Sequence, residues 1–267
     1  MATKKEKDAQ ALVEKKATEM AMYEGMDDSD GGGFENADSD SFAVPFIKVL
    51  QKLSPQCDED SESFIEGAKA GMLFNTVSGE LFSDGLTAIP CHYVRTFLEW
   101  VPRDQGGGLT NVFDADAGVN LMQTCTRDDN NRDILPNGNE LQDTRVHYIL
   151  VQSEDGTFNP AIVSLSRTQI KSSKDWMSKM KQWKLPNGNG AAMFAQVWKL
   201  STKKRTKGED TWSVLIAESQ NLIFEAFPEN YQPILASAKE FRDLIASGVA
   251  KVDHAATQEQ TETEEEM

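Results

Sequence analysis

The sequence predicts a β-rich α+β domain between two acidic tails, and three observations lead to this prediction. Short runs of β-branched, aromatic and aliphatic residues recur through the middle of the chain, separated by Gly, Pro and Asn, as in a sheet of short strands. Two longer stretches repeat their apolar residues at three and four residue steps, as helices do. Both ends are acidic and poor in the large apolar residues that a core needs.

The acidity of the 267-residue chain resides mostly in its ends. The formal net charge is −16, and residues 1–41 and 252–267 each carry −6, which leaves −4 for residues 43–251. Segments of this composition bury too little apolar surface to offset the entropy lost on ordering. We therefore expect disordered acidic segments at 1–41 and 252–267, and a single folded domain at 42–251.

The first elements of the domain are expected near residue 42. Residues 42–54 fit a helical face, but their β-branched residues fit a strand as well. Residues 71–77 and 80–82 flank Ser78-Gly79, which is a tight hairpin signal.

A meander and an irregular excursion follow. Residues 86–91 and 93–101 have the composition of two strands, and residues 103–108, with three consecutive glycines, form a mobile or tightly turning loop. The polar region 114–143 looks like an excursion from the sheet, with weak helical character around residues 119–123.

Regular elements resume near residue 145. Strands are expected at 145–152 and 160–165, with a turn at Glu154-Asp155-Gly156 between them. A helix is then expected from Ser166 or Arg167 to about Trp183.

The last part of the domain is predicted as a strand pair and a helix. The strands span residues 192–200 and 211–217 and are joined by a basic turn at 202–208, and the helix spans residues 233–247 with Gly248 as its C-cap. The count is seven or eight short strands with two or three helices. It fits an elaborated OB-like barrel with a basic helix and a C-terminal helix.

Residues 167–207 form a basic segment within this acidic chain. They contain eleven Lys or Arg residues and one acidic residue, Asp175, together with three tryptophans and one phenylalanine. Cations attract phosphates and flat rings stack on bases, which is the combination that binding of single strands requires. A solvated helix face also carries many lysines, but these charges are unbalanced and continue through two strands.

The candidate DNA contacts combine this segment with a weaker basic and aromatic group near residue 100. They are Arg95, Trp100, Arg103, Lys171, Lys174, Trp176, Lys181, Trp183, Lys199, Lys203, Lys204, Arg205 and Lys207. Trp176 and Trp183 are seven residues apart and share a helix side, so they are either core or base-stacking rings. Phe194 and Trp198 share a strand face and form either a core layer or part of a contact surface.

Other kinds of site have little support in the sequence. The glycines at 106–108 lack the Lys-Ser/Thr pair of a phosphate loop. His92, His147 and His254 are scattered, and the three cysteines lie 34 residues apart, so we expect no metal, no cofactor and reduced, mostly buried thiols. No catalytic arrangement emerges, and no stretch approaches the about 18 apolar residues of a membrane helix. The expected protein is a cytoplasmic non-enzyme.

Several motifs resemble a family of single-stranded DNA-binding proteins from bacteriophages and prophages. They are FAVPFIKVLQ (42–51), SPQ (54–56), GMLFNTVSGE (71–80), FLEWVPRDQGGG (97–108) and AKEFRD (238–243). The resemblance spans residues 42–251. It implies an OB-related fold, no catalysis and roles in phage replication, recombination or repair. Acidic C-terminal tails are usual among phage single-strand binders and often end in an aromatic residue, whereas this chain ends in Met267.

The sequence thus favours a protein that binds single-stranded DNA with little sequence preference and protects it in the host cytoplasm. The C-terminal acidic residues either bind replication or recombination proteins or act as a solubility tail; they are Glu262, Glu264, Glu265, Glu266 and Met267. The alternative is a protein-interaction factor, such as a transcription regulator or recombinase partner, whose basic segment binds acidic protein surfaces.

Overall fold

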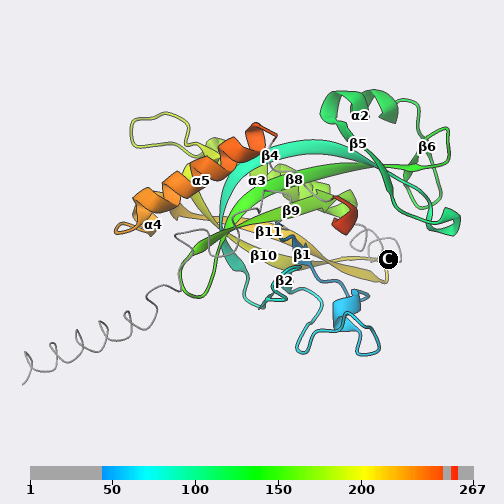
Figure 1. Ribbon diagram of the computed structural model, residues 1–267, viewed down its shortest axis with the longest axis horizontal. Helices are drawn as coiled ribbons and strands as arrows, with labels where there is room; N and C mark the ends of the chain where they lie inside the picture. Colours follow the sequence, from blue (N-terminus) through cyan, green and yellow to red (C-terminus); the bar gives the residue numbers. More distant parts are fainter. Residues whose placement is uncertain (1–43, 249–253, 258–267) are drawn as a thin grey trace, which may run out of the picture. The chain divides into compact units, whose positions relative to one another are not determined.

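The computed structural model of the protein describes residues 44–248 and 254–257 (Figure 1). The predicted N-terminal segment, residues 1–41, lies outside the described residues. The predicted C-terminal segment also lies outside them, apart from a short 3-10 helix at His254–Thr257.

An eight-stranded antiparallel sheet is the main element of the structure, with the order β11-β10-β4-β8-β7-β6; β5 also pairs with β4, and β9 with β8. Its strands are β4 (Leu86–Trp100), β5 (Leu109–Asp114), β6 (Thr126–Arg127), β7 (Asp133–Ile134), β8 (Glu140–Gln152), β9 (Phe158–Ser166), β10 (Gln196–Lys207) and β11 (Asp210–Leu222). The long strands curl into a half-barrel, as Figure 1 shows for β4 and β8. The β-rich α+β prediction is confirmed.

A second, three-stranded sheet contains β1 (Ile47–Val49), β2 (Leu73–Asn75) and β3 (Leu81–Phe82). The predicted hairpin is present, with Leu73 opposite Phe82. The ambiguous segment at 42–54 contributes a strand rather than a helix. A parallel bridge from Phe46 to Ile162 links this sheet to β9.

The helices are α2 (Ala115–Met122), α3 (Ile170–Gln182), α4 (Ile223–Ala226) and α5 (Tyr231–Ala246). The predicted basic helix is α3, entered through a 3-10 helix at Arg167–Gln169. The predicted C-terminal helix is α5, followed by Gly248 with a φ of 74°. The weak helical signal within 114–143 corresponds to α2, whose first turn is capped by Asp114 accepting from the Ala117 N–H at 2.8 Å.

Two predicted boundaries were wrong. Residues 86–91 and 93–101 are not two strands of a meander, because β4 runs through both. Pro90, which cannot donate to the ladder, lies at a register shift: Pro90 pairs with Ile149 and His92 with Tyr148, so the strand continues past it. Residues 202–208 are not a turn, because β10 and β11 remain paired as far as Lys207 and Asp210.

Apolar clusters cover both faces of the curled sheet. Alternate strand residues face the interior, where Trp198 and Leu200 meet Trp176 and Met180 from α3; we call this the interior cluster. The opposite face is covered by α5 (Figure 1), which contributes residues such as Phe241 to a second apolar cluster. A third, smaller cluster lies under α2. Since α3 completes the interior cluster, its position beside the sheet is fixed by packing.

Two buried glutamines form hydrogen bonds with backbone groups of the edge strand β11. The Gln51 amide donates to Ser213 O at 2.9 Å and accepts from the Ser213 N–H at 2.9 Å. The Gln169 amide donates to the same oxygen at 2.9 Å and accepts from the Leu215 N–H at 3.0 Å. These bonds satisfy groups that an edge strand would otherwise expose, and they hold the start of α3 against β11.

His147 is wholly buried beside the interior cluster. Its ring stacks on Trp176 with ring centres 4.6 Å apart, and its Nε2 lies 2.8 Å from Ser173 Oγ. Burial, with a smaller effect of the Arg145 charge, lowers the pKa of His147 to about 3.

We expect the protein to lose stability as the pH falls below about 6.5, the ordinary pKa of histidine. Below that pH the unfolded chain binds a proton at His147, whereas the folded chain binds it only when the pH approaches 3. Lowering the pH therefore lowers the free energy of unfolding. Between about pH 7 and about pH 5 this group alone accounts for about 2 kcal/mol. Urea unfolding of the wild type and His147→Gln at both pH values checks this. Equal pH dependence in the two proteins would contradict the assignment.

Candidate nucleic-acid interface

The hairpin of β10 and β11 carries its cations mainly on one face. Cross-strand partners share a face of a sheet and alternate residues repeat it. The register pairs Lys203 with Val214 and Arg205 with Trp212. We call this side the cationic face after Lys199, Lys203, Arg205 and Lys207; it also carries Trp212, together with Glu218 opposite Lys199 and Asp210 opposite Lys207. Lys204 pairs with Ser213 and lies on the opposite face.

The cationic face borders a groove between α3 and β11. The groove has a volume of about 270 Å³, and its lining includes Thr168, Lys171, Asp175, Lys179, Arg205 and Trp212. Lys171, Asp175 and Lys179 are four residues apart and therefore lie along one side of α3. We call this hollow the α3–β11 groove.

Trp212 gives the α3–β11 groove a partly exposed flat ring. Its indole Nε1 is buried and has no hydrogen-bond partner among the described residues. Lys179 Nζ donates to Ala217 O at 2.8 Å, which fixes this ammonium beside β11. Lys171 and Arg205 are exposed. The groove thus combines cations with a ring face, the groups that attract phosphates and stack on bases.

The structure places the sequence-predicted contacts in several different surroundings. Lys171 and Arg205 line the groove, and Lys199, Lys203 and Lys207 share the cationic face. Lys174 and Lys181 are exposed on α3 outside the groove lining, and Lys204 lies on the other face of the hairpin. Arg103 is exposed in the loop after β4, and Trp183 packs partly buried against the interior cluster.

Two predicted contacts require correction. Trp176 is 1 % exposed and lies edge-on to Trp198 in the interior cluster, so its ring is a core group. Trp100 is 5 % exposed and donates its indole N–H to Gln142 Oε1 at 3.0 Å. A base could reach either ring only after the core had opened. Arg95 of the same weaker group forms a two-bond pair with Asp143, at 3.1 and 2.7 Å.

Trp212 is absent from the sequence-predicted contacts because residues 202–208 are predicted as a turn. With residues 202–208 as a turn, the ring had no defined place opposite the basic residues. Gly208, with a φ of 63°, is the first residue of the two-residue loop Gly208-Glu209. A Gly-X pair is a signal for such tight hairpins, and applying it would have placed Arg205 opposite Trp212.

The cysteines are free, as predicted, but the prediction that most of them are buried was wrong, because Cys57 and Cys125 are partly exposed and only Cys91 is buried. Burial raises the pKa of Cys91 to about 12 and also raises the pKa values of Cys57 and Cys125. Raised thiol pKa values disfavour the reactive thiolate at neutral pH. Within residues 44–248 and 254–257, no group of His, Cys, Asp or Glu side chains has the arrangement of a metal site. No helix in the same residues is long and apolar enough to cross a membrane.

The fold and the groove define a β-rich α+β protein with a curled sheet and a cationic, tryptophan-bearing surface. Residues 13–251 match the family described as Pam3 phage gp34-like protein, and the chain belongs to that family. It is therefore a protein of bacteriophage type. The comparisons with curated proteins and with solved structures gave no match.

Proposed function

We propose that the protein binds single-stranded DNA with little sequence preference, on a curled sheet that is a variant of the OB barrel. The observation that carries this proposal is the cationic face together with the α3–β11 groove, whose lining contains Lys171, Lys179 and Arg205 with Trp212 and one carboxylate, Asp175. Membership in a phage family supports a role in phage DNA replication, recombination or repair within the host cell.

In the proposed mechanism the cationic side chains bind the phosphates and the Trp212 ring binds a base. Lysines act as flexible point charges that follow the phosphates, while Trp212 stacks on a base of any identity. Salt screens charges beyond about 10 Å at 0.1 M, so the local charge of the binding surface matters more than the net charge of the whole chain. Binding of this kind involves no cofactor and no catalysis. The acidic residues 262–267 supply a surface for basic replication or recombination proteins.

We expect affinity for single-stranded DNA to fall about 20- to 100-fold between 50 and 200 mM salt, because each of about three to five phosphate contacts contributes a slope of roughly −0.7. Mobility shifts with single-stranded DNA, duplex DNA and RNA at both salt concentrations measure this. Quenching of tryptophan fluorescence by short oligonucleotides gives a second readout. Salt-insensitive binding, or equal affinity for the duplex, would contradict the proposal. An absence of any response would favour docking of an acidic protein surface instead.

A further inference from the structure

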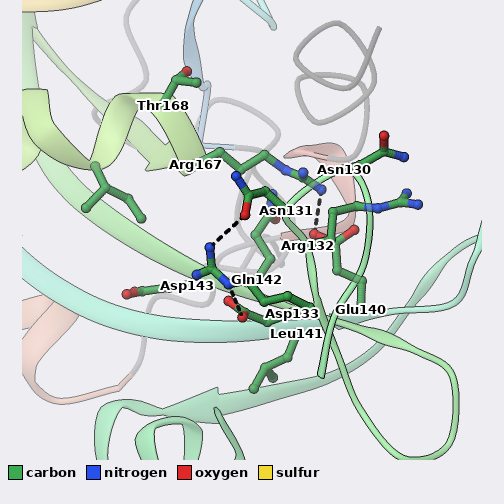
Figure 2. A pocket seen from close by; sticks show the side chains of 12 residues that line it. Asn130, Asn131, Arg132, Asp133, Glu140, Leu141, Gln142, Asp143, Arg167 and Thr168 are labelled. Carbon is green, nitrogen blue, oxygen red and sulfur yellow. Dashed lines mark hydrogen bonds and ion pairs between the residues drawn. The ribbon is translucent and has the colours of Figure 1, made fainter. Parts of the chain in front are cut away.

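Five of the chain's eight arginines gather around a second, polar hollow at the other side of the start of α3. The hollow has a volume of about 480 Å³, and its lining includes Arg127, Asn131, Arg132, Glu140, Arg167 and Thr168 (Figure 2). We call it the arginine hollow. Arg95 and Arg145 both pair with Asp143, a lining residue of the hollow, at 2.7 and 2.8 Å.

Carboxylates and amides hold the lining arginines in place. Arg127 donates to Asp133 and to Asn131, both at 3.1 Å, and Arg167 lies 2.5 Å from Glu140 (dashed lines in Figure 2). A guanidinium has five N–H donors, so these bonds orient Arg127 without using all of them. Its side chain is 63 % exposed. A held, accessible guanidinium is suited to the planar, two-oxygen recognition of a phosphate.

The backbone around the hollow is held in an uncommon conformation. Asn131 and Arg167 are the two non-glycine residues with positive φ among those that the structure describes, at 66° and 45°, and both line the hollow. A left-handed backbone at a bulky residue costs energy and clusters at ligand-binding sites. The conformation at Arg167 turns the chain sharply between β9 and α3.

Thr168 lines both the arginine hollow and the α3–β11 groove. The two cavities therefore meet at the start of α3. The described lining of the arginine hollow contains no aromatic ring. It holds three arginines and three carboxylates, Asp133, Glu140 and Asp143, so it offers guanidinium and amide donors but no stacking surface.

We propose that the arginine hollow binds a backbone phosphate of the same single strand after the strand leaves the α3–β11 groove past Thr168. This inference rests on the proposed function and extends the DNA-binding surface from the α3–β11 groove to the arginine hollow. Guanidinium and amide groups would contact phosphate oxygens in the hollow, while base stacking stays at Trp212.

The test uses Arg127→Ala, since the exposed side chain can be removed with little effect on the core. Affinity is measured for oligo-dT strands of about 4 to about 16 nucleotides, the range of site sizes of single OB domains. We expect the variant to match the wild type on the shortest strands and to bind the longest roughly tenfold more weakly, since one charge-assisted contact is lost. Its salt slope on long strands should fall by about 0.7. Arg242→Ala removes a partly exposed arginine of α5 that lies outside both cavities and over the Phe194 ring, and it is the charge-matched control.

The outcomes separate this inference from the proposed function. If Arg127→Ala binds strands of every length as tightly as the wild type does, the arginine hollow is not a phosphate site, while the DNA-binding proposal stands. No binding by the wild type overturns both. A second arm follows the Arg127 Nε–H signal by NMR during addition of inorganic phosphate or oligonucleotides. If inorganic phosphate shifts this signal and DNA affinity loses no more on long strands than on short ones, the ligand of the hollow is a free anion. That result also overturns the proposed contact with the DNA backbone.

Discussion

Replacing Lys203 and Arg205 together with alanine is expected to weaken binding of single-stranded DNA roughly 100-fold, at about 1.5 kcal/mol for each charge-assisted contact. The two cations are alternate residues of β10 on the cationic face, and Arg205 lies opposite Trp212. Loss of two phosphate contacts should also reduce the salt slope by about 1.4. The effect should be the same for all sequences, because the contacts are to the backbone. Fluorescence titrations with homopolymers at several salt concentrations measure all three quantities.

Lys204→Ala is the matched control for this variant. Lys204 lies between the two residues and is also exposed, but the register places it on the opposite face with Ser213. We expect its removal to change affinity by about threefold or less, as loss of an unspecific charge does. If Lys204→Ala loses half as much binding free energy as the double variant does, net charge and not the cationic face determines binding.

Most elements with a local signal could be predicted from the sequence. The tight turn at Ser78-Gly79, the apolar repeat of α5 and its terminal glycine all depend on neighbours in the chain. The outer half of β10 has no apolar signal of its own, and only the Gly208-Glu209 loop that follows it marks its end. Residues 202–207 are polar on both faces because the strand extends beyond the core, so no apolar alternation marks it. Its strand character comes from pairing with β11.

The sequence predicted which charged residues lie on the surface of the candidate site, but it did not predict which aromatic rings lie there. Lysines are rarely buried, so a cluster of them indicates a surface even without a structure. A tryptophan fits a core or a binding surface equally well, and its burial depends on what packs over it. Trp176 meets Trp198 and His147, which lie far from it in the sequence. That contact cannot be deduced from the basic segment, and the Arg205–Trp212 pairing is indicated only by the Gly208-Glu209 loop that follows the segment.

Trp212→Ala and Trp176→Ala are therefore expected to have opposite effects on DNA binding and on stability. Loss of the Trp212 ring should weaken single-strand binding by about 1 to 3 kcal/mol, the contribution of one stacked base, with little change in the free energy of unfolding, since the ring is partly exposed. Loss of the buried Trp176 ring should lower the free energy of unfolding by about 3 to 5 kcal/mol. Urea unfolding and oligonucleotide titrations of both variants measure the two effects.

Phenylalanine at each position makes the comparison sharper. Trp212→Phe keeps a flat ring in the groove and should recover most of the affinity that alanine loses, because stacking tolerates any aromatic face. Trp176→Phe keeps apolar volume and should recover part of the stability. If the folded Trp176→Phe protein loses DNA affinity while Trp212→Ala retains it, the strand does not run through the α3–β11 groove. The binding surface would then have to include the inner side of α3, which in this structure is covered by the interior cluster.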